Sequence, residues 1–263
     1  MTVFRCLNTA LTLRVLWSLL AVGVLVLAVT VSFYAGAAGA TWRVPDAEMH
    51  RLPSESENIV NAFHNLYGYS GDKTWRNTFW RGTPVMNNPM DLWIYQEIIY
   101  ETRPDWLLET GTYKGGSALF FASLFDLINN GQVVTVDITD FAGKPEHRRI
   151  KYLLGSSTSD QLVNKIKRLI KDSDKVMVML DSDHRAEHVL NELRIYSKLV
   201  TQGCYLVIED TALNGHPVYP NFGPGPMEAV QAFLKENNDF VVDESREKFL
   251  FTASPRGYLR KVK

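Results

Sequence analysis

Cysteine, clustered charge and sequence repeats are all scarce in this chain. Its 263 residues include only two cysteines, Cys6 and Cys204, which lie far apart, so an internal disulfide framework is excluded. Basic and acidic side chains nearly balance, with 28 Lys and Arg against 29 Asp and Glu, and no basic block stands out. We therefore expect no nucleic-acid partner. The chain also has no obvious haem, flavin or iron–sulfur motif.

Charge is absent altogether from one segment near the N-terminus. Residues 15–34 read VLWSLLAVGVLVLAVTVSFY, and 20 uncharged residues can cross a hydrocarbon core of about 30 Å as a helix. Arg5 and Arg14 precede this segment, so we predict a single-pass membrane anchor with a cytoplasmic N-terminus. A cleaved signal peptide is the alternative, because AGAAGA at 35–40 offers small residues for cleavage.

The chain is expected to divide around this segment. We predict a cytoplasmic N-terminus at 1–14, the anchor at 15–34, a polar stalk at 35–56 and one globular domain at 57–263. The arginine rule places that domain across the membrane from the cytoplasm. The chain has no N-x-[ST] sequon, so glycosylation cannot report the side, and the side stays open.

The globular part alternates short apolar runs with helical patterns. This alternation predicts an α/β, Rossmann-like fold, in which a mostly parallel sheet has helices on both faces. Ligands of such sheets bind outside the carboxyl ends of the strands. The predicted strands are 105–109, 132–137, 175–181, 204–210, 249–254 and 257–262, and the predicted helices are 88–102, 115–128, 159–170, 186–200 and 225–236.

The first of these strands leads into a glycine-rich loop, ETGTYKGGS. A triphosphate loop would need a lysine after Gly116, but Ser117 follows. A dinucleotide loop needs G-x-G-x-x-G, and Glu109 beside this loop would repel a pyrophosphate. S-adenosylmethionine fits better, because it carries no phosphate and two cationic groups that an acid attracts. Asp137 ends the next strand, where an acid can accept both ribose hydroxyls; alternatively, Glu109 only caps the loop and Asp137 is a solvated strand end.

Acidic residues also follow the two most apolar strands. Asp181 and Asp183 lie in LDSDH, and Glu209 and Asp210 lie in VIEDT. If these strands are neighbours, the carboxylates repel one another unless a hard divalent cation such as Mg²⁺, Mn²⁺ or Ca²⁺ binds them. Asp183 is equally placed to cap the following helix. The spacing leaves open which of Asp181 and Asp183 binds the metal.

Several motifs resemble the cephalosporin hydroxylase/rhamnosyl O-methyltransferase family. They span most of residues 60–260 in order, and EDTALNGHPV followed by FGPGPMEA is highly specific. The resemblance implies a class I methyltransferase fold that uses S-adenosylmethionine and a Mg²⁺ site. The matching stretches are NNPMDLWIYQEII (87–99), ETGTYKGGSALFFA (109–122), VVTVD (133–137), GSSTS (155–159), LDSDHRAEHVLNEL (180–193), YLVIEDTALNGHPV (205–218) and FGPGPMEAVQAF (222–233).

The resemblance and the motifs together assign site residues. One of the LDSDH aspartates joins Glu209 and Asp210 at the metal. His184 and His216 are candidate bases, because histidine titrates near neutrality, although His216 is equally placed to shape its own turn. The residues assigned to the methyl donor are Glu109, Gly111, Thr112, Tyr113, Gly115, Ser117, Asp137, Ser156, Ser157 and Asp181.

The expected activity is metal-dependent transfer of a methyl group from S-adenosylmethionine to a hydroxyl of a sugar or glycolipid-like small molecule. The expected partners are that acceptor and a membrane, through the N-terminal helix. A non-catalytic, membrane-tethered S-adenosylmethionine-binding protein and a hydroxylase-associated partner protein are the alternatives. The sequence does not decide whether the chain forms a homo-oligomer, or how a domain outside the cytoplasm would obtain a donor made in the cytosol.

Overall fold

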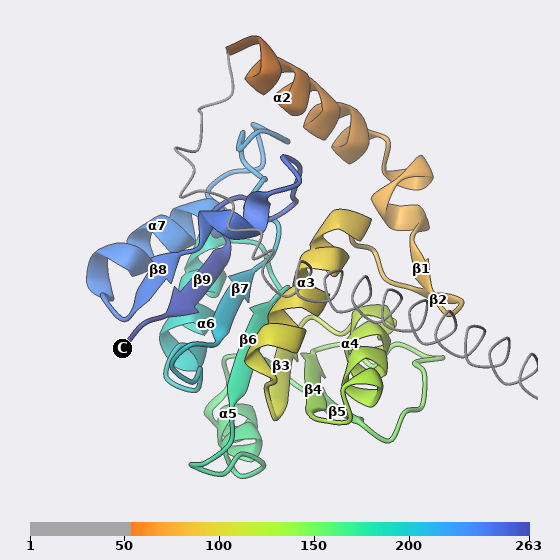
Figure 1. Ribbon diagram of the computed structural model, residues 1–263, viewed down its shortest axis with the longest axis vertical. Coiled ribbons are helices and arrows are strands. Elements are labelled where there is room, and N and C mark those ends of the chain that lie inside the picture. The colour runs from red at the N-terminus through yellow and green to blue at the C-terminus, as the bar shows by residue number, and fades with distance from the viewer. Residues whose placement is uncertain (1–53) are drawn as a thin grey trace, which may run out of the picture. The chain divides into compact units, whose positions relative to one another are not determined.

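A seven-stranded sheet organises residues 54–263, the part of the chain that the computed structural model describes. Its strand order is β5-β4-β3-β6-β7-β9-β8, and only the β7–β9 and β9–β8 pairs are antiparallel (Figure 1). The predicted Rossmann-like α/β architecture is therefore confirmed. The strands are β3 (Trp106–Thr110), β4 (Gln132–Asp137), β5 (Ile150–Leu154), β6 (Val176–Leu180), β7 (Tyr205–Ile208), β8 (Phe240–Val242) and β9 (Tyr258–Lys261).

Helices cover both faces of this sheet. One face packs against α3 (Pro89–Thr102) and α4 (Gly116–Leu127), and the other packs against α5 (Asp160–Lys167), α6 (Ala186–Tyr196) and α7 (Pro226–Glu236). Alternate strand residues face opposite helices, so Leu107 belongs to the first core and Leu108 to the second. The central strands are fully buried, which explains why they read as continuous apolar runs rather than alternating ones.

Local signals in the sequence set the ends of the helices. The side chain of Asn88 caps α3 by accepting from the backbone N–H groups of Met90 (2.8 Å) and Asp91 (3.0 Å), and Pro89 occupies the first helical position. The same helix ends at Thr102, where Arg103 adopts a left-handed conformation just before Pro104. The carboxyl end of α3 is thus fixed immediately before β3.

The strands differ from the sequence prediction in three places within the main sheet and its loops. The predicted strand at 249–254 is wrong, because this stretch is a loop whose backbone pairs with side chains; Ala253 N–H donates to Asp91 Oδ2 (2.8 Å), for example. Edge strands β5 and β8 were not predicted, and β5 is mostly half-exposed, so its sequence lacks a strong apolar run. Helix α6 also ends at Tyr196, before the predicted residue 200.

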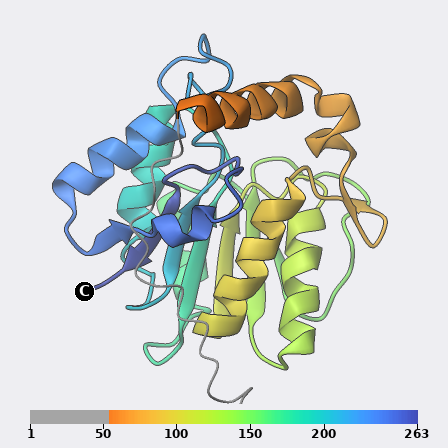
Figure 2. The ribbon, with the colours of Figure 1, turned by 45° about the horizontal axis from the view of Figure 1, so that its top comes forward.

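The segment before α3 lies across the edge at which the parallel strands end (Figure 2). It contains α2 (Ser54–Tyr69), the short helices η1 (Gly71–Lys73) and η2 (Trp75–Asn77), and a hairpin of β1 (Phe79–Trp80) and β2 (Thr83–Pro84). A last short helix, η3 (Glu244–Glu247), lies between β8 and β9.

The predicted membrane anchor at 15–34 lies outside the described residues, as do the N-terminal residues 1–14 and nearly all of the predicted stalk at 35–56. Among residues 54–263, no helix is both long enough and apolar enough to cross a bilayer. The anchor therefore stays a prediction.

Candidate functional site

A cavity of about 970 Å³ opens where β3, β4, β6 and β7 end. Residues that follow these strands line it from one side, and side chains of α2, η2 and the loop after β7 line it from the other. This is the edge at which open α/β sheets bind their ligands. A cavity of this size accommodates two medium-sized molecules or parts of them.

The glycine-rich loop between β3 and α4 forms one wall of the cavity. Gly111 has a φ of +90°, and a Cβ built there would lie 1.9 Å from the carbonyl oxygen of Asp181. Any side chain would therefore collide with the backbone at the end of β6. Gly115 has a φ of +76° and begins α4, so the chain turns sharply from strand to helix. Both glycines are required by the backbone path.

The loop is tied to the end of β4 through Asp137. Its carboxylate accepts hydrogen bonds from the backbone N–H of Tyr113 and of Thr139, both at 2.9 Å. Asp137 lines the cavity together with Ile138 and Phe141. An acid placed in this way meets the requirement for a ribose-binding residue.

Glu109 is buried beneath the loop and does not line the cavity. Thr135 donates to its Oε2 (2.5 Å), and Thr112 lies 2.6 Å from Thr135 between their hydroxyl oxygens. Within residues 54–263, Oε1 of Glu109 has no hydrogen-bond partner, although it is buried. Burial raises the pKa of Glu109 to about 7. A buried acceptor in this state favours a nearby donor or cation.

Asp181, His184 and Asp210 converge at the floor of the cavity. Nε2 of His184 lies 3.3 Å from an oxygen of Asp181 and 3.3 Å from an oxygen of Asp210. One ligand atom from each residue lies within 4.8 Å of the others. Their side chains stay partly open, at 32% and 42% exposed for the two aspartates, because they face the cavity. Burial and the nearby carboxylate of Glu209 raise the pKa of Asp181 well above its usual range.

Backbone strain accompanies this cluster. Asp210 has a φ of +56°, in the left-handed region that non-glycine residues seldom adopt. Its peptide follows β7 directly, and the turn brings the carboxylate back toward Asp181. Strain of this kind persists where the surrounding structure requires it, and it concentrates at functional sites.

Glu209 lies behind the cluster and is almost fully buried. Its Oε2 accepts from the hydroxyl of Ser254 (2.7 Å), and its Oε1 accepts from the hydroxyl of Tyr95 (2.5 Å) and the amide of Asn87 (3.4 Å). Burial raises the pKa of Glu209 to about 8. These three donors fix the carboxylate beside Asp210, with an edge at the cavity.

Asp183 and His216 are not brought into the cluster. Asp183 binds Arg185 Nε through both carboxylate oxygens (3.0 and 2.9 Å), and this partner lowers the pKa of Asp183 to about 2. Nε2 of His216 lies 2.9 Å from Glu228, and His216 does not line the cavity. The geometry therefore favours Asp181 over Asp183 as a metal ligand, and His184 over His216 as a base.

Most of the remaining residues predicted to bind the methyl donor line the cavity, and one does not. The cavity wall also includes Thr112, Tyr113, Ser117, Ser156 and Ser157, while Gly115 is buried at the start of α4. The sequence analysis missed His188, whose Nε2 lies 3.3 Å from the hydroxyl of Ser157 and lines the same wall. The available signal was its place in the first turn of α6, directly after the LDSDH motif.

The residues at the cavity fit both a divalent cation and S-adenosylmethionine. Asp181 and Asp210 present oxygen ligands at a mutual spacing that one hard cation spans, and His184 is the third side chain of the cluster. Gly111 and Tyr113 line the wall beside Asp137, where Ile138 and Phe141 add apolar surface that an adenosine could contact.

Aromatic side chains and one arginine line the other half of the cavity. They come from α2, η2 and the loops after β7 and η3. Aromatic faces and a guanidinium suit a sugar, with its apolar ring faces and hydroxyl edges. These residues are Tyr67, Trp75, Arg76, Tyr219, Phe222 and Phe251.

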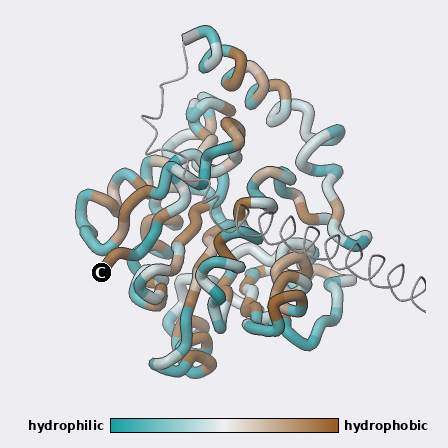
Figure 3. Tube along the Cα trace, in the orientation of Figure 1, coloured by the Kyte–Doolittle hydropathy of each residue, from teal (hydrophilic) through white to brown (hydrophobic). Residues whose placement is uncertain are grey.

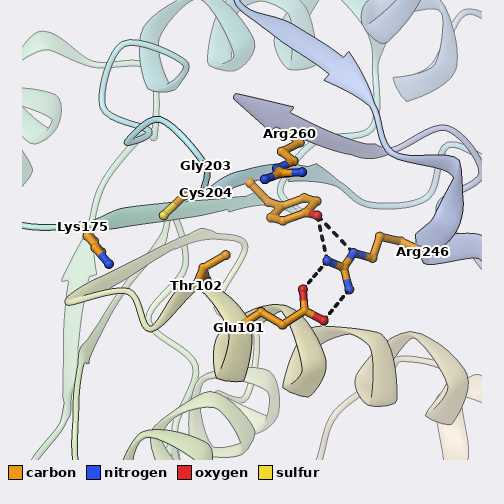
Figure 4. Close-up of a pocket in the computed structure, with 8 residues that line it drawn as sticks. Glu101, Thr102, Lys175, Gly203, Cys204, Arg246 and Arg260 are labelled. Atoms are coloured by element: carbon orange, nitrogen blue, oxygen red, sulfur yellow. Dashed lines mark hydrogen bonds and ion pairs between the residues drawn. The ribbon is translucent and has the colours of Figure 1, made fainter. Parts of the chain in front are cut away.

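A second cavity of about 260 Å³ lies at the opposite ends of the strands (Figure 4). Its most buried cation, Arg246, donates to the carboxylate of Glu101 (3.1 Å) and to the hydroxyl of Tyr205 (2.9 Å). Lys175 and Arg260 complete the rim. The arginine is already paired, and no carboxylates crowd together here.

Comparisons with known proteins agree with this geometry. A family model described as "Rhamnosyl O-methyltransferase/CmcI" matches residues 72–262. The chain is 38% identical over 220 residues to a rhamnosyl O-methyltransferase of Mycobacterium tuberculosis H37Rv, covering 81% of this chain and 88% of that protein. A rhamnosyl O-methyltransferase of Mycobacterium leprae is 39% identical over 212 residues, covering 78% and 91% of the two chains. A solved CmcI structure with Mg and SAM shares the fold, with a TM-score of 0.56 and 22% identity over 72% of this chain and 78% of CmcI.

Proposed function

The chain belongs to the rhamnosyl O-methyltransferase/CmcI family and is an S-adenosylmethionine-dependent O-methyltransferase, and we propose that it methylates a sugar hydroxyl at the Asp181–Asp210 cluster. The observation that carries this proposal is the position of the cluster. The cluster shares one cavity with the glycine-rich loop and with the aromatic side chains, and Gly111 of that loop packs directly against the backbone of Asp181. Donor and acceptor would therefore meet at the carboxylates.

The donor belongs on the side of β3 and β4. Asp137 would accept the ribose hydroxyls, and Ser156 and Ser157 would face the adenine, since all three line one wall. Gly111 lets the loop pass close to the backbone of Asp181, and it lines the wall against which the methionine part of the donor would lie. S-adenosylmethionine supplies the methyl group on a positively charged sulfur.

The acceptor belongs on the aromatic side. Trp75, Tyr219 and Phe222 would hold the apolar face of a sugar ring, and Arg76 would bind a hydroxyl. The curated relatives are rhamnosyl O-methyltransferases, which supports a rhamnosyl group as the acceptor class.

Asp181 and Asp210 would hold a divalent cation, with Glu209 completing the oxygen set. Such a cation lowers the pKa of an acceptor hydroxyl when it is bound. His184 is placed to take the proton at Nε2, because this atom lies beside both aspartates. Tyr95 and Ser254 keep Glu209 fixed, so the cluster is already organised before the acceptor arrives.

Transfer of an isotopically labelled methyl group tests this proposal. The full chain is incubated with Mg²⁺, S-adenosylmethionine carrying a trideuteriomethyl group, and a panel of rhamnosides and other glycosides. We expect mass spectrometry to find the labelled methyl on one sugar hydroxyl, and Asp210→Asn to form this product at a strongly reduced rate. Donor binding without transfer to any acceptor would favour the non-catalytic binding protein instead.

A further inference from the structure

Helix α2 presents an apolar face to solvent. Ile59 is 69% exposed, Phe63 43%, Leu66 66% and Tyr69 58%. Positions 59, 63 and 66 recur at helical spacing, so these side chains form one continuous stripe, and Ala62 lies within it. A surface helix normally places this stripe against the core, so the stripe indicates a contact made outside the domain.

The other face of the helix is already docked on the domain. His64 is buried and donates from Nε2 to the carbonyl oxygen of Thr252 (3.0 Å). The rings of His64 and Tyr67 lie 4.5 and 4.9 Å from the ring of Phe251, measured between centroids. Because these contacts fix the rotation of α2, the exposed stripe cannot turn inward without breaking them.

The loop that supports α2 adds to the same surface. Leu250 precedes Phe251, is 56% exposed and has a φ of +65°, which is costly for a bulky residue. A strained backbone that keeps a leucine in water is unfavourable for an isolated domain. The strain is understandable if the leucine has an apolar environment outside the domain.

Charge on α2 is restricted to its first turn. Glu55 and Glu57 are its only charged residues, and no basic residue occurs between Ser54 and Tyr69. The hydropathy colouring shows hydrophobic positions recurring along α2 (Figure 3). The exposed stripe can enter the acyl boundary of a bilayer through its apolar side chains, and without lysine or arginine α2 gains no attraction to anionic headgroups.

The short distance along the chain between the uncharged segment at 15–34 and α2 indicates which partner the exposed face of α2 contacts. The uncharged segment at 15–34 ends 19 residues before α2 begins, and 19 extended residues span at most about 65 Å. If that segment is inserted in a membrane, the apolar face of α2 is held within reach of the same membrane. Local concentration then favours the bilayer over any freely diffusing partner.

We propose that the exposed face of α2, with Leu250, lies on the surface of a phospholipid bilayer. His64, Tyr67 and Gly68 of the same helix line the large cavity, so α2 would separate lipid from the acceptor half of the site. This contact would bring the cavity to the level at which the sugar of a lipid-anchored acceptor is found. The contact itself does not depend on which hydroxyl is methylated.

Spin labels at two exposed leucines test this contact. Leu66→Cys and Leu127→Cys are each introduced into the full chain carrying Cys6→Ser, while the buried Cys204 is kept. Leu127 is 82% exposed on α4 and serves as the matched control. The labelled chains are reconstituted in phosphatidylcholine vesicles, and collision rates with oxygen and with a water-soluble nickel chelate are measured.

We expect the label at position 66 to gain oxygen collisions and lose nickel collisions relative to position 127, with no change in high salt. Equal nickel access at both positions would overturn the proposal, as would failure of the chain to bind vesicles. A second copy on this face would instead give spin–spin broadening that disappears on dilution with unlabelled chain, and this too would overturn it. Methyl transfer to a water-soluble glycoside, assayed in parallel, reports separately on the proposed function.

Discussion

Charged side chains are paired with opposite charges at the amino ends of the parallel strands, but like charges lie together at the carboxyl ends. At the amino ends, Arg246 is paired with Glu101, and the hydrogen bond from Arg246 lowers the pKa of that glutamate. At the carboxyl ends, Asp181 and Asp210 lie together, and burial is the main cause that raises the pKa of each. At the amino ends the charges of Arg246 and Glu101 are paired. At the carboxyl ends the carboxylates of Asp181 and Asp210 repel each other, and a bound cation would relieve this repulsion.

This difference separates structural charge from functional charge. The charge of a side chain in an ion pair is already neutralised by its partner in the protein, so it does not require a ligand of opposite charge. Clustered acids with raised pKa values are unfavourable in the free protein, so they indicate a site that is completed on binding. The strained peptide of Asp210 lies at the same end of the strands.

The largest effect is expected from removing one carboxylate of the cluster. Asp210→Asn should lower kcat by about 10²–10³-fold, because a cation site worth several kcal/mol in the transition state loses a charged ligand. Steady-state kinetics with saturating Mg²⁺ measure this. Asp183→Asn is the control and should stay close to wild type, because its carboxylate faces Arg185. Equal losses in both variants would contradict the assignment of Asp181 and Asp210 as the pair.

Glu109 should contribute to the pH dependence of the free energy of unfolding of the ligand-free protein, alongside Asp181, Glu209 and Asp210. Burial raises its pKa from 4.5 to about 7, so the stability contributed by the neutral carboxyl is full below about pH 4.5 and is lost as the pH rises through about 7. The loss should be on the order of 3 kcal/mol. Glu109→Gln should remove this part of the decline. Urea unfolding of the wild type and of Glu109→Gln at pH 5 and pH 8 measures this loss of unfolding free energy. The same loss in both proteins would show that the titration of Glu109 does not cause it.

Alanine substitutions at two glycines distinguish the energetic cost of backbone strain from the cost of a steric clash. Gly111→Ala and Gly143→Ala both place a side chain at positive φ, +90° and +78°, but only the first meets another backbone atom. Gly143→Ala should cost about 1 kcal/mol, and Gly111→Ala should cost about 1–3 kcal/mol more. Gly111→Ala should also weaken S-adenosylmethionine binding, since the β3 and β6 ends must separate. Calorimetric unfolding measures the loss of stability in each variant, and titration with S-adenosylmethionine measures donor binding. Equal losses of stability would mean that the ends of β3 and β6 move apart at no energetic cost.

The amino-end ion pair should matter least to activity. Arg246→Ala leaves the distant cavity untouched, so kcat should change by no more than about twofold, which corresponds to about 0.4 kcal/mol. Thermal unfolding should shift downward, because Tyr205 and Asp243 lose the same partner. A large loss of kcat at unchanged stability would show that the two ends are coupled.

The sequence predicted most of the fold because the central strands are buried on both faces and therefore read as apolar runs. It failed at 249–254, where an apolar stretch is used as a loop against α2 and Asp91. It also left Asp181 and Asp183 equivalent, since only the position of Arg185 separates them. Tyr95 and Ser254, which hold Glu209, lie 114 and 45 residues away from it, so no local pattern could reveal them.

The most direct test of the central claim is methyl transfer by the full chain after rigorous chelation and again after Mg²⁺ is restored. Because Asp181 and Asp210 would lose the cation while Asp137 and the glycine-rich loop stay intact, we predict that transfer stops, donor binding persists, and Mg²⁺ restores the activity. Full activity in a chelated sample that contains no metal by elemental analysis would contradict the account.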